Sequence, residues 1–192
     1  MKPRRELTKQ EQLDLNLFLS KAVPLCAQGK PHIFQASKGS MMFIKESKDI
    51  KTKEKGPLVL PSGNLIIVDE YWGNIEKLTG QYIICLEDID NPIFKLDYRS
   101  EAMTRGLEKN DKGEFLHKNN IKECMHAALS QEGKKYPWRG PESFNYKGYN
   151  YVHIPSCTNM YYLDGREYVI ESRTGEQLLR TKYVASIINP FA

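Results

Sequence analysis

Three residues close together in the chain have the side chains that a thiol-dependent reaction needs. His153 and Cys157 lie four residues apart, and Asp164 follows them. A cysteine nucleophile uses a histidine as its base and a third polar group that orients the histidine. One hypothesis is therefore a cysteine-dependent hydrolase that uses Cys157, His153 and Asp164. The other interpretation is three ordinary strand residues, because the fold rather than the spacing brings a Cys and a His together.

The histidines do not show the spacings typical of a metal site. They stand at positions 32, 117, 126 and 153, with no H-x-x-x-H or H-E-x-x-H run. Such a run would place two ligands on one face of a helix. We interpret all four as solvated or core histidines and expect no metal and no other cofactor.

Arg139 has the surroundings most typical of a ligand contact. Pro137, Gly140 and Pro141 stiffen the loop around it,. A guanidinium held by a rigid loop suits a bidentate contact with a carboxylate or a phosphate. Aromatic side chains would then supply apolar contact area at little entropic cost. The predicted ligand-binding residues are Asp69, Tyr71, Trp138, Arg139 and Tyr151.

An internal ion pair is the alternative for Arg139. Its partner would be Glu142, Asp69 or Glu70, and the pair would tie the loop to the first half of the chain,. The two interpretations predict opposite effects of removing the side chain. An exposed ligand contact could be lost without much change in stability, whereas a buried pair could not.

Aromatic and basic residues are interleaved between residues 134 and 168. Such a composition can stack bases and neutralise phosphates, so nucleic-acid binding is one alternative function,. Tyrosine is also common on ordinary strands, with its ring half buried and its hydroxyl in water. The cations stand among many acidic residues and form no continuous basic stripe. A small-molecule or protein partner is therefore preferred over nucleic acid.

The composition is that of a globular protein in a reducing compartment. The 192 residues are 40% hydrophobic and 27% charged, with a net charge of +4,. The four cysteines show neither a C-x-x-C pair nor the close spacing of a disulfide framework,. No apolar run approaches the ~18 residues that cross a bilayer. These features predict a cytoplasmic protein without a membrane partner.

Two amphipathic helices are predicted, one for each half of the chain. The first begins at the capping box "TKQE" at Thr8 and ends before Pro24, with Leu15, Phe18, Leu19 and Ala22 on one face,. The second runs over residues 120–132 and ends at Gly133,. Each helix is expected to pack on a sheet through its apolar face.

The strands are predicted from two similar stretches of sequence. "GNIEKLTG" begins at Gly73, and "TNMYYLDG" begins 85 positions later at Thr158. Residues 62–101 align with residues 147–186 without a gap, and apolar positions and turn residues agree. Each stretch is typical of a three-stranded antiparallel meander, with Gly80 and Gly165 predicted in turns.

The predicted fold class is α+β. Two similar halves, about 7–104 and 117–188, are expected to form a single domain over residues 1–192, joined by a charged linker. Each half would contribute an amphipathic helix and a three-stranded antiparallel sheet, related by a pseudo-twofold axis.

Several of these stretches resemble a bacterial family described as domain of unknown function 5680. The resemblance covers most of residues 12–188. It rests on the D-x-Y-x-G pattern that begins at Asp69, on Pro92 and on the "RGPESF" run from Arg139 to Phe144. Two features depart from the family's pattern, namely "SCTN" in the second half and a longer stretch over residues 30–61. The resemblance implies a stand-alone protein or a domain beside a helix-turn-helix segment of a transcription regulator, and it implies no activity and no catalytic residues.

The preferred function from the sequence is non-enzymatic binding. We expect a sensor or interaction domain with a ligand cleft between its halves. The first alternative is the cysteine-dependent hydrolase, and the second is a nucleic-acid-binding protein that uses residues 134–168.

Overall fold

The computed structural model describes residues 9–27, 32–37, 40–46, 59–60, 63–73, 76–86, 92–131 and 134–188. The helices are α1 (Lys9–Ala27), a short 3-10 helix η2 (Thr104–Leu107) and α2 (Lys118–Leu129). The strands are β1 (His32–Ser37), β2 (Ser40–Glu46), β3 (Val59–Leu60), β4 (Gly63–Gly73), β5 (Lys77–Leu86), β6 (Pro92–Ala102), β7 (Ser143–Tyr146), β8 (Tyr149–Asn159), β9 (Tyr162–Glu171) and β10 (Gln177–Ile187).

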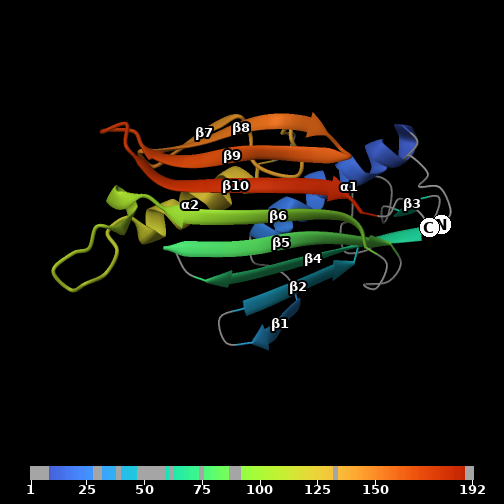
Figure 1. The fold of residues 1–192 in the computed structure, drawn as a ribbon, viewed down its shortest axis with the longest axis horizontal. Helices are drawn as coiled ribbons and strands as arrows, with labels where there is room; N and C mark the ends of the chain where they lie inside the picture. Colours follow the sequence, from blue (N-terminus) through green and yellow to red (C-terminus); the bar gives the residue numbers. More distant parts are fainter. Residues whose placement is uncertain are drawn as a thin grey trace.

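The strands of the described residues form one antiparallel sheet. Their order is β1-β2-β4-β5-β6-β10-β9-β8-β7, and β3 pairs with β4 (Figure 1). Strands β4, β5 and β6 are neighbours in both sequence and space, and so are β8, β9 and β10. Strands β6 and β10 join the two groups, with Tyr98 opposite Tyr183 near the middle of the contact. The predicted α+β class with antiparallel strands is therefore confirmed.

The sheet is continuous, whereas two three-stranded sheets were predicted. Each predicted meander would have left its third strand as an edge with unpaired backbone N–H and C=O groups. In the structure β6 and β10 pair with each other, from Ala102 opposite Leu179 to Phe94 opposite Ile187. The two third strands thus become the centre of the sheet.

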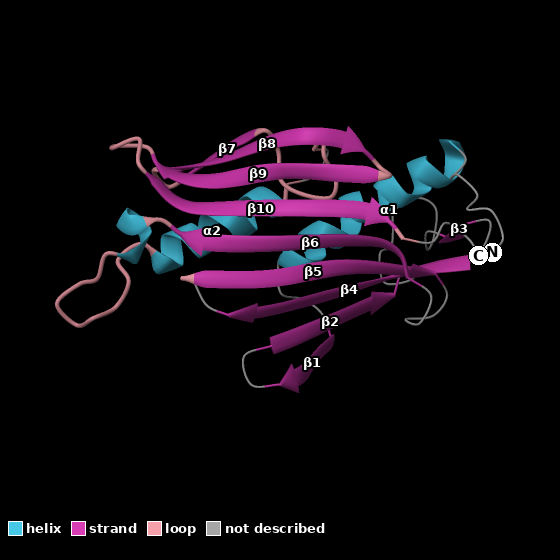
Figure 2. Ribbon diagram, viewed as in Figure 1, coloured by secondary structure: helices cyan, strands magenta, loops and turns pink. Residues whose placement is uncertain are grey.

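Both helices lie on the same face of the sheet (Figure 2). We call this the inner face and the opposite one the outer face. Side chains alternate between them along β6, where Leu96 and Tyr98 are buried and Asp97 and Arg99 are exposed. Such alternation is expected for an antiparallel sheet with one covered side.

The apolar stripes of the helices fill the space over the inner face. Leu15, Phe18, Leu19 and Ala22 of α1 are buried as predicted, in a cluster that also contains Tyr82, Phe94 and Leu163. The buried residues of α2 are Ile121, Cys124, Ala128 and Leu129.

The helix ends differ from the prediction by about one turn. Helix α1 continues through Pro24 to Ala27, and Pro24 itself is buried. Packing of this kind offsets the hydrogen bond that a proline removes inside a helix. The predicted cap at Thr8 lies outside the described residues. Helix α2 begins after His117 and ends at Leu129, before the predicted stop.

Gly80 and Gly165 lie inside strands β5 and β9, so their assignment to turns was wrong. Each stands opposite a buried tyrosine, Gly80 opposite Tyr98 and Gly165 opposite Tyr183. A Cβ atom on Gly165 would lie 2.5 Å from the Tyr183 hydroxyl oxygen and 2.8 Å from the carbonyl oxygen of Ile154. The position therefore requires glycine because neighbouring atoms lie too close to its backbone for a side chain, and not because the chain turns there.

Candidate functional site

A buried ion pair joins the loop of residues 134–142 to the inner face of the sheet. Arg139 Nε donates a hydrogen bond to Oε1 of Glu167 over 2.8 Å, and Nη2 donates to Oε2. Arg139 is 2% exposed and Glu167 is 0% exposed. We call residues 134–142 the Arg139 loop. The pair is bidentate, which is the strongest geometry for a guanidinium and a carboxylate.

Two neighbouring groups complete the contacts of the ion pair. The Tyr151 hydroxyl donates to Oε1 of Glu167 and accepts from the backbone N–H of Gly140 over 3.1 Å. Burial raises the pKa of Tyr151, and the charge of Glu167 adds to this effect. Burial alone would also raise the pKa of Glu167, but the charge and hydrogen bonds of Arg139 hold it below its usual value. Glu167 is therefore an ionised carboxylate in the core.

His153 connects the Arg139 loop to the central strands. Its Nδ1 lies 3.1 Å from the carbonyl oxygen of Gly140, and its Nε2 lies 2.7 Å from the Tyr183 hydroxyl. A neutral ring satisfies both contacts if Nδ1 donates and Nε2 accepts. Burial lowers the pKa of His153. The ring is therefore neutral near pH 7.

The guanidinium of Arg139 lies over two neighbouring tyrosine rings of the central strands. Its Cζ is 5.1 Å from the ring centroid of Tyr98 and 5.8 Å from that of Tyr183. These distances allow cation–π attraction, which is stronger away from water. The Tyr98 hydroxyl in turn donates to Asp69 over 3.4 Å. The network therefore extends from β8 to β4 across the inner face.

A lysine holds the beginning of the Arg139 loop against the end of α2. Lys134 Nζ donates to the carbonyl oxygen of Leu129 over 2.5 Å. A cation at this end of a helix also interacts favourably with the helix dipole. Burial lowers the pKa of Lys134 to about 7.

All five residues predicted to bind a ligand belong to the inner face. Asp69, Arg139 and Tyr151 are part of the polar network, and Trp138 and Tyr71 lie in the core beside α1. Arg139 is buried in an ion pair, which was the alternative to an exposed ligand contact. Its partner is Glu167, whereas Glu142, Asp69 or Glu70 was expected. The side chain of Glu70 lies outside the described residues.

The sequence contained a pattern from which the burial of Glu167 could have been predicted. Along β9 the buried residues are Leu163, Gly165, Glu167 and Val169, which alternate with exposed or half-buried ones. The alternation that places Leu163 and Val169 in the core also places the carboxylate there. A carboxylate at such a position needs a buried cation, and the rigid loop supplies Arg139.

The structure separates the three residues of the hydrolase hypothesis. His153 lies opposite Glu167 on the inner face, whereas Cys157 lies opposite Asp164. The pairing of β8 with β9 shifts between Pro155 and Cys157, which turns the later residues of β8 over,. Cys157 and Asp164 therefore share the outer face, and His153 points away from them. Both ring nitrogens of His153 already have partners.

We predict that acid destabilises the protein through His153. Its pKa in the folded state is below the ordinary value of 6.5, so the unfolded state binds more protons as the pH falls below about 6.5,. The free energy of unfolding in urea should therefore be lower at about pH 5.5 than at about pH 6.5, a range that lies below the pKa of about 7 of Lys134 and so largely excludes its titration,. Glu167 does not contribute to this difference. A carboxylate whose pKa is lowered by folding changes the stability only at pH values near or below its ordinary pKa, which is 4.5,.

A His153→Gln variant should lose most of this dependence on pH. His126 of α2 provides the control. Partial burial of its ring and the charge of Lys122 also lower its pKa, but the residue as a whole is exposed to water. Water can solvate its charged ring, so His126→Gln should keep most of the dependence. The same loss of stability with acid in His153→Gln as in the unchanged protein would contradict the prediction.

The outer face carries a row of three cations on the central strands. Lys182 of β10 lies opposite Arg99 of β6 on one side and opposite Arg166 of β9 on the other. All three side chains are exposed. Among the described residues none of the three side chains has a hydrogen bond or an ion pair. We call Arg99, Lys182 and Arg166 the cation row.

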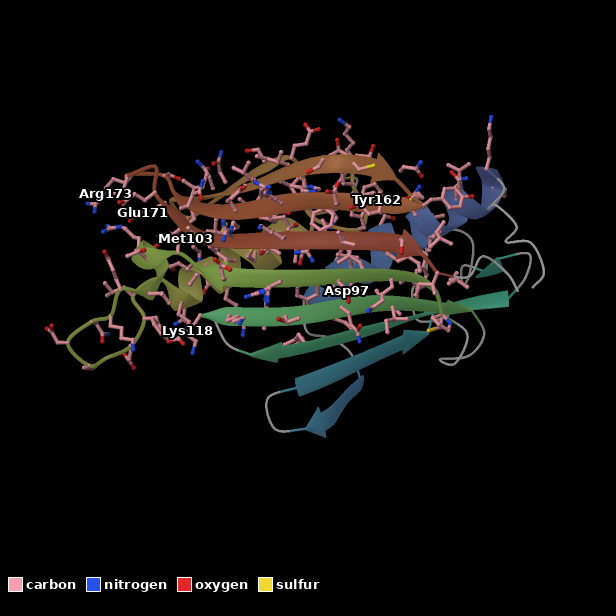
Figure 3. The ribbon with its side chains drawn as sticks, in the orientation of Figure 1. Asp97, Met103, Lys118, Tyr162, Glu171 and Arg173 are labelled. Atoms are coloured by element: carbon pink, nitrogen blue, oxygen red, sulfur yellow. The ribbon has the colours of Figure 1, made fainter. Side chains whose placement is uncertain are left out.

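Two pairs of neighbouring charges on the outer face form ion pairs within the sheet. Arg180 contacts Glu101 over 2.7 Å, and Lys95 contacts Asp97 over 2.9 Å. Figure 3 shows this face toward the viewer, with Asp97 and Tyr162 among its side chains. Within the described part of the sheet, the cation row therefore differs from its surroundings in lacking acidic partners.

Comparisons of the chain with protein-family models, with curated proteins and with solved structures gave no match. The resemblance to domain of unknown function 5680 stays a prediction. In the described part of the chain there is no helix long and apolar enough to cross a membrane. The described residues also include no cluster of His, Cys, Asp or Glu that could hold a metal ion.

Proposed function

We propose that the protein is a non-enzymatic interaction domain that binds an acidic protein segment through the outer face of its sheet. The observation that carries the proposal is the cation row. Arg99, Lys182 and Arg166 lie directly opposite one another and have no acidic partner among the described residues.

The cation row is unfavourable for the folded protein by itself. Like charges directly opposite each other on neighbouring strands destabilise a sheet. An acidic residue at position 182 would relieve the repulsion on both sides. A bound acidic partner would do the same, so the three cations, which lack acidic partners among the described residues, support a role in binding.

Exposed apolar residues beside the cation row favour a protein partner. Ile154 lies opposite Arg166 and is 53% exposed, and Val184 follows Lys182 on the same face and is 44% exposed. Protein interfaces combine such apolar contacts with charges at their rim.

The proposal predicts that Lys182→Glu weakens binding and stabilises the fold. Binding to a fluorescein-labelled polyglutamate peptide, followed by fluorescence anisotropy, should weaken by about tenfold or more. The free energy of unfolding should rise by about 0.5 to 1 kcal/mol, because the introduced carboxylate would pair with the cations on both neighbouring strands. A residue with only a structural role would not give these opposite changes.

Lys112→Glu is the matched control. Lys112 is exposed in the segment before α2, and the change alters the net charge by the same amount. Its effect on peptide binding should be much smaller. Equal losses in the two variants would contradict a site at the cation row. Tighter, Lys182-dependent binding of single-stranded DNA than of the peptide would favour nucleic acid instead.

We further propose that the two halves of the chain are related by a pseudo-twofold axis between Tyr98 and Tyr183. The strand pairings support this relation. Leu78 pairs with Ser100 in the first half, and Leu163 pairs with Ala185 in the second, each shifted by 85 positions. The register also shifts after Ile84 in the first half and beyond Val169 in the second.

A reducing, cytoplasmic setting belongs to the same proposal. Its support is that Cys124 and Cys157 are free thiols. Proteins that fold in oxidising compartments commonly use such residues in disulfides.

A further inference from the structure

We infer that the acidic partner is an α-helix that lies across strands β6, β10 and β9. This inference rests on the proposed function, because it specifies the shape of the segment that the cation row binds. It follows from the direction of the row, from its spacing and from the residues around it.

The outer face is uniformly positive only in the direction across the strands. Along β6 the charges on the outer face alternate in sign through Asp97, Arg99 and Glu101. Along β9 Asp164 precedes Arg166 on the same face. A chain of carboxylates that ran along a strand would therefore meet an acid next to each arginine. Across the strands it would meet only Arg99, Lys182 and Arg166.

The spacing of the cation row matches the repeat of a helix. Neighbouring strands are about 4.8 Å apart, so the three positions span about 10 Å. Residues i, i+4 and i+7 on one face of a helix span about 10.5 Å along its axis. Three residues on one face of an extended strand span about 13 Å, and the mismatch grows with each further residue. A helix with carboxylates at these positions therefore faces all three cations together.

The apolar neighbours specify the rest of the helix surface. Ile154 continues the row beyond Arg166, one strand further along the sheet. Val184 lies beside Lys182, between Asp97 and Asp164. A complementary helix would carry a line of acidic residues that faces the cation row. An apolar residue at the end of this line would contact Ile154, and a second apolar residue beside the line would contact Val184. The partner is thus an acidic amphipathic helix.

The test compares three fluorescein-labelled peptides of closely similar composition. The first places glutamates at every third or fourth position, and it places leucines where the partner would meet Ile154 and Val184. The glutamates and leucines then lie on one face of the helix. The second has the same residues in scrambled order, and the third carries proline in the middle. Anisotropy titrations should show binding of the first peptide about tenfold tighter than binding of the other two, because only it is preorganised.

Two variants connect the difference to the surface. Lys182→Glu should remove the preference for the first peptide. Ile154→Ser should weaken the first peptide several-fold, whereas Leu116→Ser, at a comparably exposed leucine away from the sheet, should leave its binding unchanged.

The outcomes separate the inference from the proposed function. If all three peptides bind equally and all depend on Lys182, the helix inference is overturned and the proposed function stands. If no acidic peptide binds in a manner that depends on Lys182, the proposed function itself fails. If a single-stranded DNA probe binds more tightly than the first peptide and depends on Lys182, the partner is not a protein helix.

Discussion

Replacing Arg139 by alanine is expected to lower the free energy of unfolding by about 3 to 5 kcal/mol. The change would leave the Glu167 carboxylate in the core without its cation, and Glu167 has no exposed surface from which to reach water. Tyr151 would remain as a donor, but a hydroxyl does not neutralise the charge. Urea unfolding followed by circular dichroism at pH 7 would measure the loss.

A matched ion pair on the surface provides the control. Arg180 contacts Glu101 over 2.7 Å, and both side chains are about one-third or more exposed. Arg180→Ala should cost less than about 1 kcal/mol, as exposed pairs do. A loss for Arg139→Ala no larger than that for Arg180→Ala would show that the buried pair is not needed for stability.

The double variant Arg139→Met, Glu167→Leu tests the reason for the loss. It removes both charges together and keeps apolar volume in their place. Buried ion pairs replaced in this way often retain or gain stability, so much of the loss in Arg139→Ala should be recovered. A double variant as unstable as Arg139→Ala would mean that hydrogen bonds of the pair, rather than the stranded charge, dominate.

Replacing Gly165 by alanine is expected to cost about 2 to 4 kcal/mol, although alanine adds only one methyl group. The new Cβ would lie 2.5 Å from the hydroxyl oxygen and 2.7 Å from Cζ of Tyr183, and 2.8 Å from the backbone oxygen of Ile154. The Tyr183 ring would have to move, and its hydrogen bond to His153 would break. The Ile154 backbone cannot move without disturbing β8. Thermal and urea unfolding would measure the change.

Gly175→Ala separates crowding from backbone strain. Gly175 has φ of +74° and no atom within 4 Å of an added Cβ, so only strain of about 1 to 2 kcal/mol is expected,. Gly165→Ala should be clearly more harmful than this control, and an equal or smaller loss would contradict the crowding argument. If the two halves are equivalent, Gly80→Ala should cost about as much as Gly165→Ala, because Gly80 lies opposite Tyr98.

The local patterns of the sequence predicted helices α1 and α2 and the strands β4–β6 and β8–β10, with the faces that they bury, but not strands β1, β2, β3 and β7. The helical stripe of Leu15, Phe18 and Leu19 and the alternation of Leu96 with Asp97 are such patterns. Each depends only on the period of its own element, 3.6 residues for a helix and 2 for a strand. The α+β class and the antiparallel strands could therefore be predicted.

Contacts between distant segments were decided only by the tertiary structure. The pairing of β6 with β10 makes one sheet and places Arg99 opposite Lys182, which no spacing within either strand reveals. The choice of Glu167 as the partner of Arg139 depends on where the Arg139 loop crosses the sheet. Such choices combine register, loop path and burial, and each of these depends on residues far apart in the chain.

The hydrolase hypothesis is a further case in which a contact between strands, rather than the local sequence, decides where side chains lie. His153 and Cys157 stand four residues apart in the chain, and regular alternation along a strand would place them on the same face,. One shift of register between Pro155 and Cys157 places them on opposite faces. Because side chains alternate with a period of 2, one extra residue reverses every position after it. The sequence determined the alternation on each side of that shift, and only the pairing of β8 with β9 decided where the reversal falls.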